Sequence, residues 1–220
     1  MKTVVAIHTA TTMVEPTKAL FAEYLPDVRL INIADDSLIQ DVIRANEVPT
    51  AVKKRLVSYY NAALDAGADV IFNTCSSVGD VAILARDLLP VPLVKIDDAM
   101  AEKAVRKYNK IGVLATLPTT LAPTARLLQK FSDELGKPVQ IEKGLAEGAF
   151  QQLMEGNVDA HNAKILETAV ALAEKVDAFV LAQGSMAKMQ DEIIKQTGKD
   201  VLSSPLLGTL QVKSVIDSLT

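Results

Sequence analysis

The sequence predicts an α/β protein of two pseudo-symmetric lobes, each a mostly parallel sheet flanked by helices. Three observations predict this fold. Short apolar runs alternate with segments of helical length, several of these runs are β-branched or leucine-rich throughout, and the second half of the chain repeats the first. Strands and helices that alternate along a chain form parallel sheets with helices on both faces.

Eight apolar runs are the predicted strands, and unbroken runs of this kind are typical of strands covered on both faces. They occupy residues 3–7, 28–33, 69–72, 93–95, 110–115, 139–143, 178–181 and 200–202. Residues 49–66 have apolar side chains at helical spacing, which predicts a helix. Residues 157–174 repeat that pattern behind a polar start at Asn157, and His161 is expected to lie exposed in the first turn.

An internal repeat relates the two halves of the chain. At an offset of 107 residues Thr9 matches Thr116, and at an offset of 108 Asp69 matches Asp177. The repeat predicts one lobe from residues 1–95 with 203–220 and a second from residues 96–202. The loops at the carboxyl ends of the strands are then expected to face one another, with the ligand site between the lobes, since open α/β sheets bind ligands at that edge.

The composition excludes several classes of protein. The net charge is −4 with no basic cluster, so we expect no nucleic-acid partner. No apolar stretch approaches the roughly 20 residues that span a bilayer, and His8 and Glu15 interrupt the N-terminal apolar run, so we expect a cytoplasmic protein. A single cysteine excludes an internal disulfide, and the absence of dinucleotide, Walker and zinc-protease motifs predicts neither a nucleotide cofactor nor a metal.

The loop around Cys75 is the sharpest chemical signal. It leaves a strand and enters a helix expected to begin near Ser76, so the thiol lies at the positive end of a helix dipole. This position predicts a lowered pKa and a reactive thiolate. Backbone N–H groups there, with the side chains of Asn73, Thr74 and Ser76, are suited to binding a carboxylate. The alternative is a small buried cysteine without a chemical role.

Two loops of the second half form the matching set. Gln183 is in register with Cys75, and Gly184 and Ser185 follow it, although a helix entry with a tight turn at Gly184 explains them equally. Thr116, Thr119 and Thr120 precede or begin a helix and are candidate carboxylate ligands. The alternative for Thr119 is a purely structural helix cap.

Two further groups are weaker candidates. His8 ends the first strand beside Thr9 and is a possible acid or base, although a lone histidine there is more often structural. Asp97 and Asp98 are adjacent acids, which are usually solvated and only occasionally bind a metal.

With these loops in place, the chain resembles the aspartate/glutamate racemase superfamily, which includes hydantoin racemases, maleate isomerases and arylmalonate decarboxylases. The residues that carry the resemblance are Asn73 to Ser76, Gly112 to Thr120 and Asp177 to Leu181. The resemblance implies two lobes with a site between them, a C-terminal helix that returns to the first lobe, a homodimer, and cofactor-independent chemistry on a small carboxylate. In the racemases one cysteine thiolate removes the α-proton and a second cysteine returns a proton on the opposite face.

Cys75 matches the first of these cysteines, and Gln183 stands where the second is expected. An amide cannot act as a general acid or base near neutral pH, which argues against ordinary two-thiol racemisation. Three interpretations remain: an isomerase that uses Cys75 as base or nucleophile, with Thr9 and the loop residues above binding substrate; a decarboxylase or lyase of the same superfamily; and a carboxylate-binding protein without activity.

Overall fold

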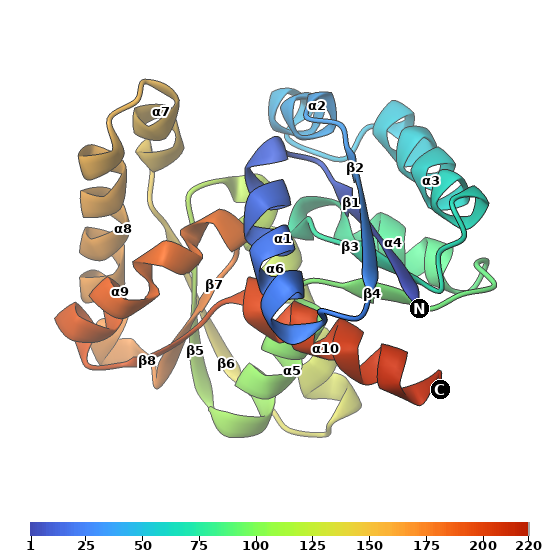
Figure 1. Cartoon of the computed structure of the whole chain (residues 1–220). Helices are drawn as coiled ribbons and strands as arrows, with labels where there is room; N and C mark the ends of the chain where they lie inside the picture. Colours follow the sequence, from blue (N-terminus) through green and yellow to red (C-terminus); the bar gives the residue numbers. More distant parts are fainter. Residues whose placement is uncertain (220) are drawn as a thin grey trace. The chain divides into compact units, whose positions relative to one another are not determined.

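The computed structural model describes residues 1–219. They divide into two compact units, which we call lobes (Figure 1). The first lobe comprises Met1–Asp98 and the C-terminal segment from Pro205, and the second comprises Ala99–Ser204. The C-terminal helix α10 (Ser204–Ser218) therefore belongs with the N-terminal sheet, as the family resemblance implied.

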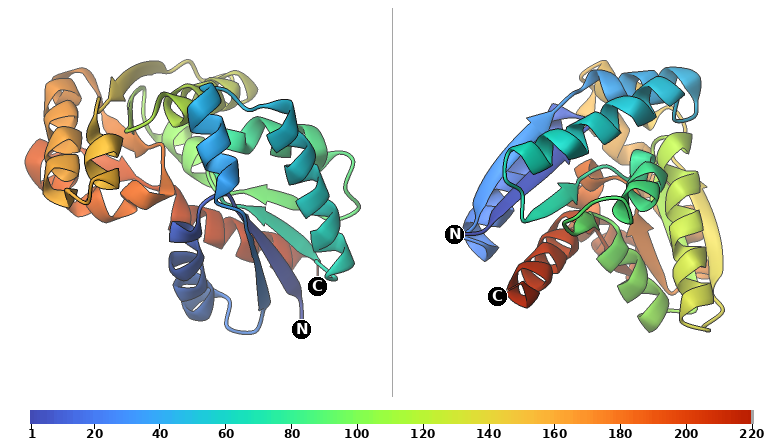
Figure 2. Two further views of the ribbon diagram at one scale, coloured as in Figure 1. Left: turned by 90° about the horizontal axis from the view of Figure 1, so that it is seen from above. Right: turned by 90° about the vertical axis from the view of Figure 1, so that its right-hand side faces the viewer.

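The first lobe is a four-stranded parallel sheet in the order β2-β1-β3-β4. Its strands are β1 (Thr3–His8), β2 (Arg29–Ala34), β3 (Val70–Asn73) and β4 (Leu93–Lys95). Helices α2 (Ser37–Ala45), α3 (Thr50–Asp65) and α4 (Gly79–Arg86) pack on one face, and α1 (Val14–Tyr24) and α10 pack on the other. Figure 2 shows α3 and α10 on opposite sides of this sheet. The alternation within β1 explains the packing, since Val5 and Ile7 enter one core and Val4 and Ala6 the other.

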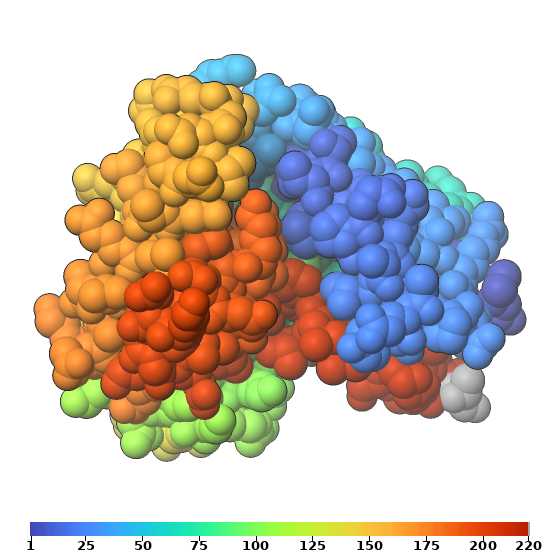
Figure 3. All heavy atoms as spheres, turned by 60° about the vertical axis from the view of Figure 1, so that its left-hand side comes forward, coloured from blue at the N-terminus to red at the C-terminus, as the bar shows by residue number. Residues whose placement is uncertain are grey.

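The second lobe repeats this design in the order β6-β5-β7-β8, again all parallel. Its strands are β5 (Lys110–Ala115), β6 (Gln140–Leu145), β7 (Ala178–Leu181) and β8 (Asp200–Leu202). Its helices are α5 (Asp98–Lys107), α6 (Pro118–Glu134), α7 (Ala149–Met154), α8 (Val158–Leu172) and α9 (Gln190–Thr197). Side chains of α7, α8 and α9 share a core with one face of the sheet, and Figure 3 shows α8 and α9, in orange tones, at the outer surface of this lobe.

The repeat predicted from the sequence is visible in matching hydrogen bonds. In the first lobe Asp69 Oδ2 accepts from the backbone N–H of Thr3 at 2.7 Å, and in the second Asp177 Oδ2 accepts from that of Lys110 at 2.9 Å. Each aspartate precedes the third strand of its lobe and ties it to the start of the first strand. The prediction of an α/β fold with two parallel sheets flanked by helices is confirmed.

The predicted elements differ from the structure in detail. Asn157 is the N-cap of α8 and accepts from the Ala160 N–H at 3.2 Å, which agrees with its predicted role. The prediction that His161 is exposed is wrong, because its side chain turns inward and the residue is only 3% exposed.

No helix among residues 1–219 is long and apolar enough to cross a membrane.

Candidate functional site

Cys75 lies just beyond β3, at the carboxyl edge of the first sheet. Its backbone is extended, with φ −128° and ψ 120°, and it is the N-cap of a 3-10 turn (Ser76–Val78) that continues into α4. The residue is half-buried. The Thr9 side chain, the backbone N–H groups of Ser77 and Val78 and the Ser77 hydroxyl act to lower the pKa of the Cys75 thiol, although the sulfur makes no cap hydrogen bond and Ser77 Oγ has no hydrogen-bond partner among residues 1–219. The loop therefore places polar groups near this sulfur that favour its anionic form.

The net electrostatic effect on Cys75 is nevertheless the opposite of the sequence prediction. Burial raises the pKa of the Cys75 thiol, and this effect outweighs the neighbouring polar groups, which lower it. The prediction of a lowered pKa is therefore wrong, because loss of hydration penalises the thiolate more than the polar groups of a short helical turn stabilise it. Near neutral pH Cys75 is a neutral thiol, which is able to donate a proton and forms a nucleophile only after losing it.

The two residues before Cys75 use their side chains inside the first lobe. Asn73 donates from Nδ2 to the carbonyl oxygen of Cys75 at 3.0 Å, and its Oδ1 accepts from the Tyr60 hydroxyl at 3.0 Å. The hydroxyl of Thr74 lies 3.0 Å from the carbonyl oxygen of Ile7. Both residues are buried, so the structure gives them a role in shaping the loop. Their predicted contact with substrate stays a prediction.

Ser76 and Ser77 follow Cys75 in this loop, and both are buried. Neither hydroxyl has a hydrogen-bond partner among the described residues, and Ser77 Oγ is buried in that state. Both hydroxyls are thus unused within the protein, and the predicted contact of Ser76 with substrate stays a prediction.

His8 bridges three strands of the first sheet. Its Nε2 is 2.8 Å from Asn32 Oδ1 on β2, and its Nδ1 is 2.9 Å from the Thr74 hydroxyl after β3. The residue has no exposed surface, and burial lowers the pKa of its imidazole, although the bond to Asn32 acts in the other direction. His8 is therefore neutral near neutral pH, with both ring nitrogens bonded within the protein. Its proposed acid or base role stays a prediction.

Gln183 occupies in the second lobe the backbone position that Cys75 occupies in the first. It is the N-cap of a 3-10 segment (Gly184–Met189). Its φ of −124° and ψ of 132° are close to the φ of −128° and ψ of 120° of Cys75. Its Oε1 accepts from the Thr116 N–H at 2.8 Å, and its Nε2 lies 2.9 Å from the Thr116 hydroxyl. Thr116 lies 107 residues after Thr9, and Gln183 lies 108 residues after Cys75. The pair Thr116–Gln183 therefore corresponds to the pair Thr9–Cys75.

The threonines at the start of α6 have separate roles. Leu117 is the N-cap of α6, and Thr120 donates its hydroxyl proton back to the Leu117 carbonyl at 3.0 Å. Thr119 does not cap the helix, which excludes the structural alternative for it. Its Oγ1 is buried without a hydrogen-bond partner among residues 1–219. A buried hydroxyl without a partner is costly, so this atom is a natural point for a ligand to bind.

The remaining residues predicted in this lobe are less distinctive. Gly184 is not among the glycines with positive φ, so its backbone needs no left-handed conformation. Ser185 is exposed on the 3-10 segment. Their contact with substrate stays a prediction.

Sequence reasoning missed a buried ion cluster at the end of β4. Asp97 and Asp98, expected to be solvated, are both buried beside Lys95, whose Nζ lies 3.4 Å and 3.1 Å from their carboxylate oxygens. Arg86 of α4 pairs with the other oxygen of Asp98 at 2.7 Å. In the sequence, the signal for this cluster was a lysine that ends an apolar strand just before two acids.

Residues 1–219 contain no cluster of three metal-binding side chains.

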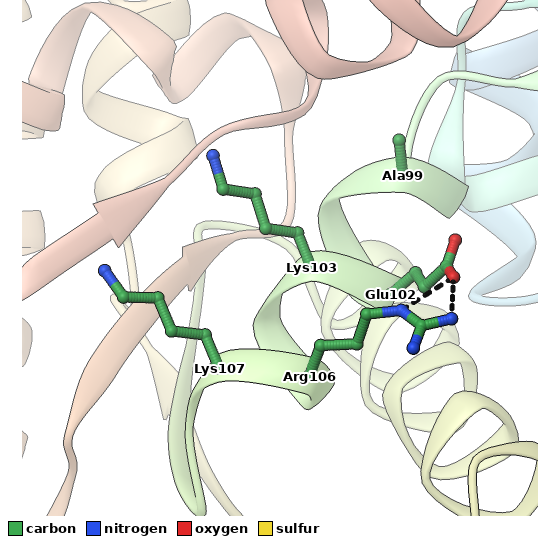
Figure 4. Close-up of a pocket in the computed structure, with 5 residues that line it drawn as sticks. All are labelled: Ala99, Glu102, Lys103, Arg106 and Lys107. Atoms are coloured by element: carbon green, nitrogen blue, oxygen red, sulfur yellow. Dashed lines mark hydrogen bonds and ion pairs between the residues drawn. The ribbon is translucent and has the colours of Figure 1, made fainter.

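A hollow of about 550 Å³ over α5 is unrelated to these loops (Figure 4). It is lined by Ala99, Glu102, Lys103, Arg106 and Lys107. Arg106 pairs with Glu102 at 2.6 Å and Lys107 with Asp200 at 2.8 Å, so most of its charge is already neutralised.

Comparison with known proteins assigns the family. The model of the Asp/Glu/hydantoin racemase family matches residues 3–212, and the chain belongs to this family. A search of curated protein sequences finds no match.

Three solved structures show the same fold at low sequence identity. Glutamate racemase from Francisella tularensis in complex with D-glutamate has a TM-score of 0.76 at 14% identity, over 99% of this chain and 82% of that chain. Allantoin racemase from Klebsiella pneumoniae has a TM-score of 0.70 at 17% identity, over 99% and 89%. A sulfate-associated variant of arylmalonate decarboxylase has a TM-score of 0.64 at 18% identity, over 99% and 94%.

Proposed function

We propose that this protein is a cofactor-independent isomerase that acts on a small carboxylate through Cys75. The observation that carries the proposal is the setting of that sulfur, which is half-buried at the carboxyl edge of a parallel sheet, beside polar groups that act to lower its pKa. Ligand sites of open α/β sheets lie at this edge. A thiol enclosed in an apolar core would have no such polar groups beside it.

The substrate carboxylate is expected at groups whose hydrogen-bonding capacity is unused. In the first lobe these groups are the Ser76 and Ser77 hydroxyls, and in the second it is the Thr119 hydroxyl at the N-terminus of α6. The 17-residue helix α6 adds the partial positive charge of its N-terminus. These groups suit an anion, although the net charge of the protein is −4.

Gln183 argues against two-thiol racemisation and favours a reaction that needs a single cysteine. Its amide is bonded to Thr116 and cannot transfer a proton. Cis–trans isomerisation of an unsaturated dicarboxylate needs a single nucleophile. The Cys75 thiol first loses its proton to water, and the thiolate adds to one alkene carbon while the π electron pair moves to the other carbon and its carboxylate. The resulting single bond rotates, and departure of the same sulfur restores the double bond.

Decarboxylation is the second candidate, and the raised pKa of Cys75 favours it. A neutral thiol is poised to protonate the carbanion left when a malonate-like acid loses carbon dioxide. The structural likeness to arylmalonate decarboxylase concerns the fold alone, so the choice rests on the reaction products.

A panel of small acids incubated in heavy water separates these reactions. Exchange of deuterium at the α-carbon indicates proton abstraction, release of carbon dioxide indicates decarboxylation, and a change of alkene geometry indicates isomerisation. We expect one of these activities and its loss in Cys75→Ala. Binding of acids without any turnover would instead support the third alternative, a carboxylate-binding protein. Sedimentation at micromolar concentration tests the predicted homodimer.

A further inference from the structure

Tyr60 is a fully buried phenol on α3 that the chemistry above does not use. It has no exposed surface, and it lies in the core between α3 and the first sheet. A phenylalanine of the same shape would fill that core equally well. The hydroxyl therefore needs another explanation, since burying a polar group is unfavourable unless it is hydrogen-bonded.

The hydroxyl begins a chain of two hydrogen bonds that ends at Cys75. Tyr60 donates to Asn73 Oδ1 at 3.0 Å, and Asn73 Nδ2 donates to the Cys75 carbonyl at 3.0 Å. Asn73 is itself fully buried as the last residue of β3. With its oxygen held by the phenol, the amide must present its NH₂ group to Cys75. The phenol thus fixes which way the amide points.

The orientation of the Cys75 carbonyl matters for the sulfur. The peptide group after Cys75 begins the 3-10 turn that contains the N–H groups of Ser77 and Val78, and these groups act to lower the pKa of the Cys75 thiol. A carbonyl that rotates takes this turn with it and moves both N–H groups relative to the sulfur. Burial, and after it the negative charge of an ionised Cys75, raises the pKa of Tyr60. This effect agrees with a Tyr60 hydroxyl that lies close to Cys75.

We propose that Tyr60 is a positioning residue of the Cys75 site, which acts through Asn73 and the Cys75 carbonyl to hold the backbone of the following turn beside the sulfur. This inference rests on the proposed function of Cys75. Titratable groups near the loop include His8, bonded to Thr74, and Lys95, which lies against Gly79 at the start of α4 and pairs with Asp97 and Asp98. None of these side chains is hydrogen-bonded to the Tyr60 hydroxyl or to the Asn73 amide, so their contacts are the same in the parent and the variants compared below.

The test compares Tyr60→Phe with Tyr59→Phe, its neighbour on the same helix. Tyr59 also donates its hydroxyl to a partly buried oxygen, Asp35 Oδ2 at 2.5 Å, but that bond leads away from Cys75. The rate of Cys75 alkylation by iodoacetamide is measured against pH in both variants. In Tyr60→Phe we expect the midpoint of the curve of alkylation rate against pH to move to higher pH. The alkylation rate near pH 8 should fall about fivefold, as for one lost hydrogen bond. In Tyr59→Phe both are expected to stay close to the parent.

A double substitution separates positioning from general loosening of the fold. If Tyr60 acts only through Asn73, Tyr60→Phe has no further effect on alkylation in an Asn73→Ala background. Equal effects of Tyr60→Phe and Tyr59→Phe, or additive effects with Asn73→Ala, overturn the inference. Thermal melts of each variant establish that it is folded.

This experiment is independent of any substrate. If the alkylation rates do not change as expected, the role of Tyr60 is wrong, whereas the proposed function of Cys75 is unaffected. Once a substrate is known, a positioning role also predicts that Tyr60→Phe lowers kcat while KM stays within about twofold. Turnover that survives Cys75→Ala removes the proposed function instead.

Discussion

Replacing Lys95 by methionine removes the cation at the centre of the buried ion cluster while keeping the length of the side chain. The ammonium lies 3.4 Å from an oxygen of Asp97 and 3.1 Å from one of Asp98. The side chains of Lys95 and Asp97 are each only 3% exposed. Asp98 keeps Arg86 as a partner in the variant, but Asp97 is left buried without a counter-ion.

The expected cost follows from this asymmetry. Removing one partner of a buried ion pair typically destabilises a protein by 3–5 kcal/mol, because the other charge stays uncompensated in a medium of low polarity. Since Arg86 still neutralises Asp98, we expect the lower end, a loss of about 3 kcal/mol in the free energy of unfolding.

Urea unfolding followed by circular dichroism measures this loss, and Lys107→Met is the matched control. Lys107 pairs with Asp200 at a similar distance, 2.8 Å, but both side chains are more than half exposed. Exposed pairs contribute little, so no resolvable change is expected there. The reasoning is refuted if Lys95→Met is no less stable than Lys107→Met.

Three further predictions concern one residue each in the three candidate loops. Gln183→Cys places a second thiol at the matching backbone position and is expected to create or raise α-proton exchange; a variant that binds substrate without any gain argues against symmetric loops. Thr119→Ala removes a buried hydroxyl and should weaken binding of small acids by about 1–3 kcal/mol in a titration, whereas unchanged binding means that Thr119 does not touch the ligand. Because burial raises the pKa of Cys75, its alkylation at pH 7 should be slower than that of a free cysteine, whose pKa is about 8.5, and should accelerate only at higher pH. A fast reaction below pH 7 would contradict the role assigned to burial.

The fold was readable from the sequence because buried parallel strands need unbroken apolar runs. Every predicted strand is present, and the offset that pairs Asp69 with Asp177 reappears as matching hydrogen bonds to the backbone N–H groups of Thr3 and Lys110. Such a repeat constrains the backbone strongly, since two copies must satisfy the same strand order.

The electrostatics of the site were not readable in the same way. The helix terminus at Cys75 is a local feature of the sequence, but the burial that raises its pKa depends on packing from distant segments. Likewise, two adjacent acids give no sign of burial until Lys95 and Arg86 are brought to them by β4 and α4. The Tyr60 hydroxyl was hidden within an apolar helix pattern, because periodicity records only which face of a helix is buried.

The central claim is that the Cys75 sulfur carries the chemistry, and Cys75→Ser tests it most directly. Serine keeps the shape of the side chain, but its hydroxyl holds its proton far more tightly than a thiol does. The measurement is turnover of the best acid from the heavy-water panel by parent and variant, with a thermal melt to establish that both are folded. The account predicts a loss of turnover by orders of magnitude in a folded variant. Turnover equal to that of the parent would contradict it.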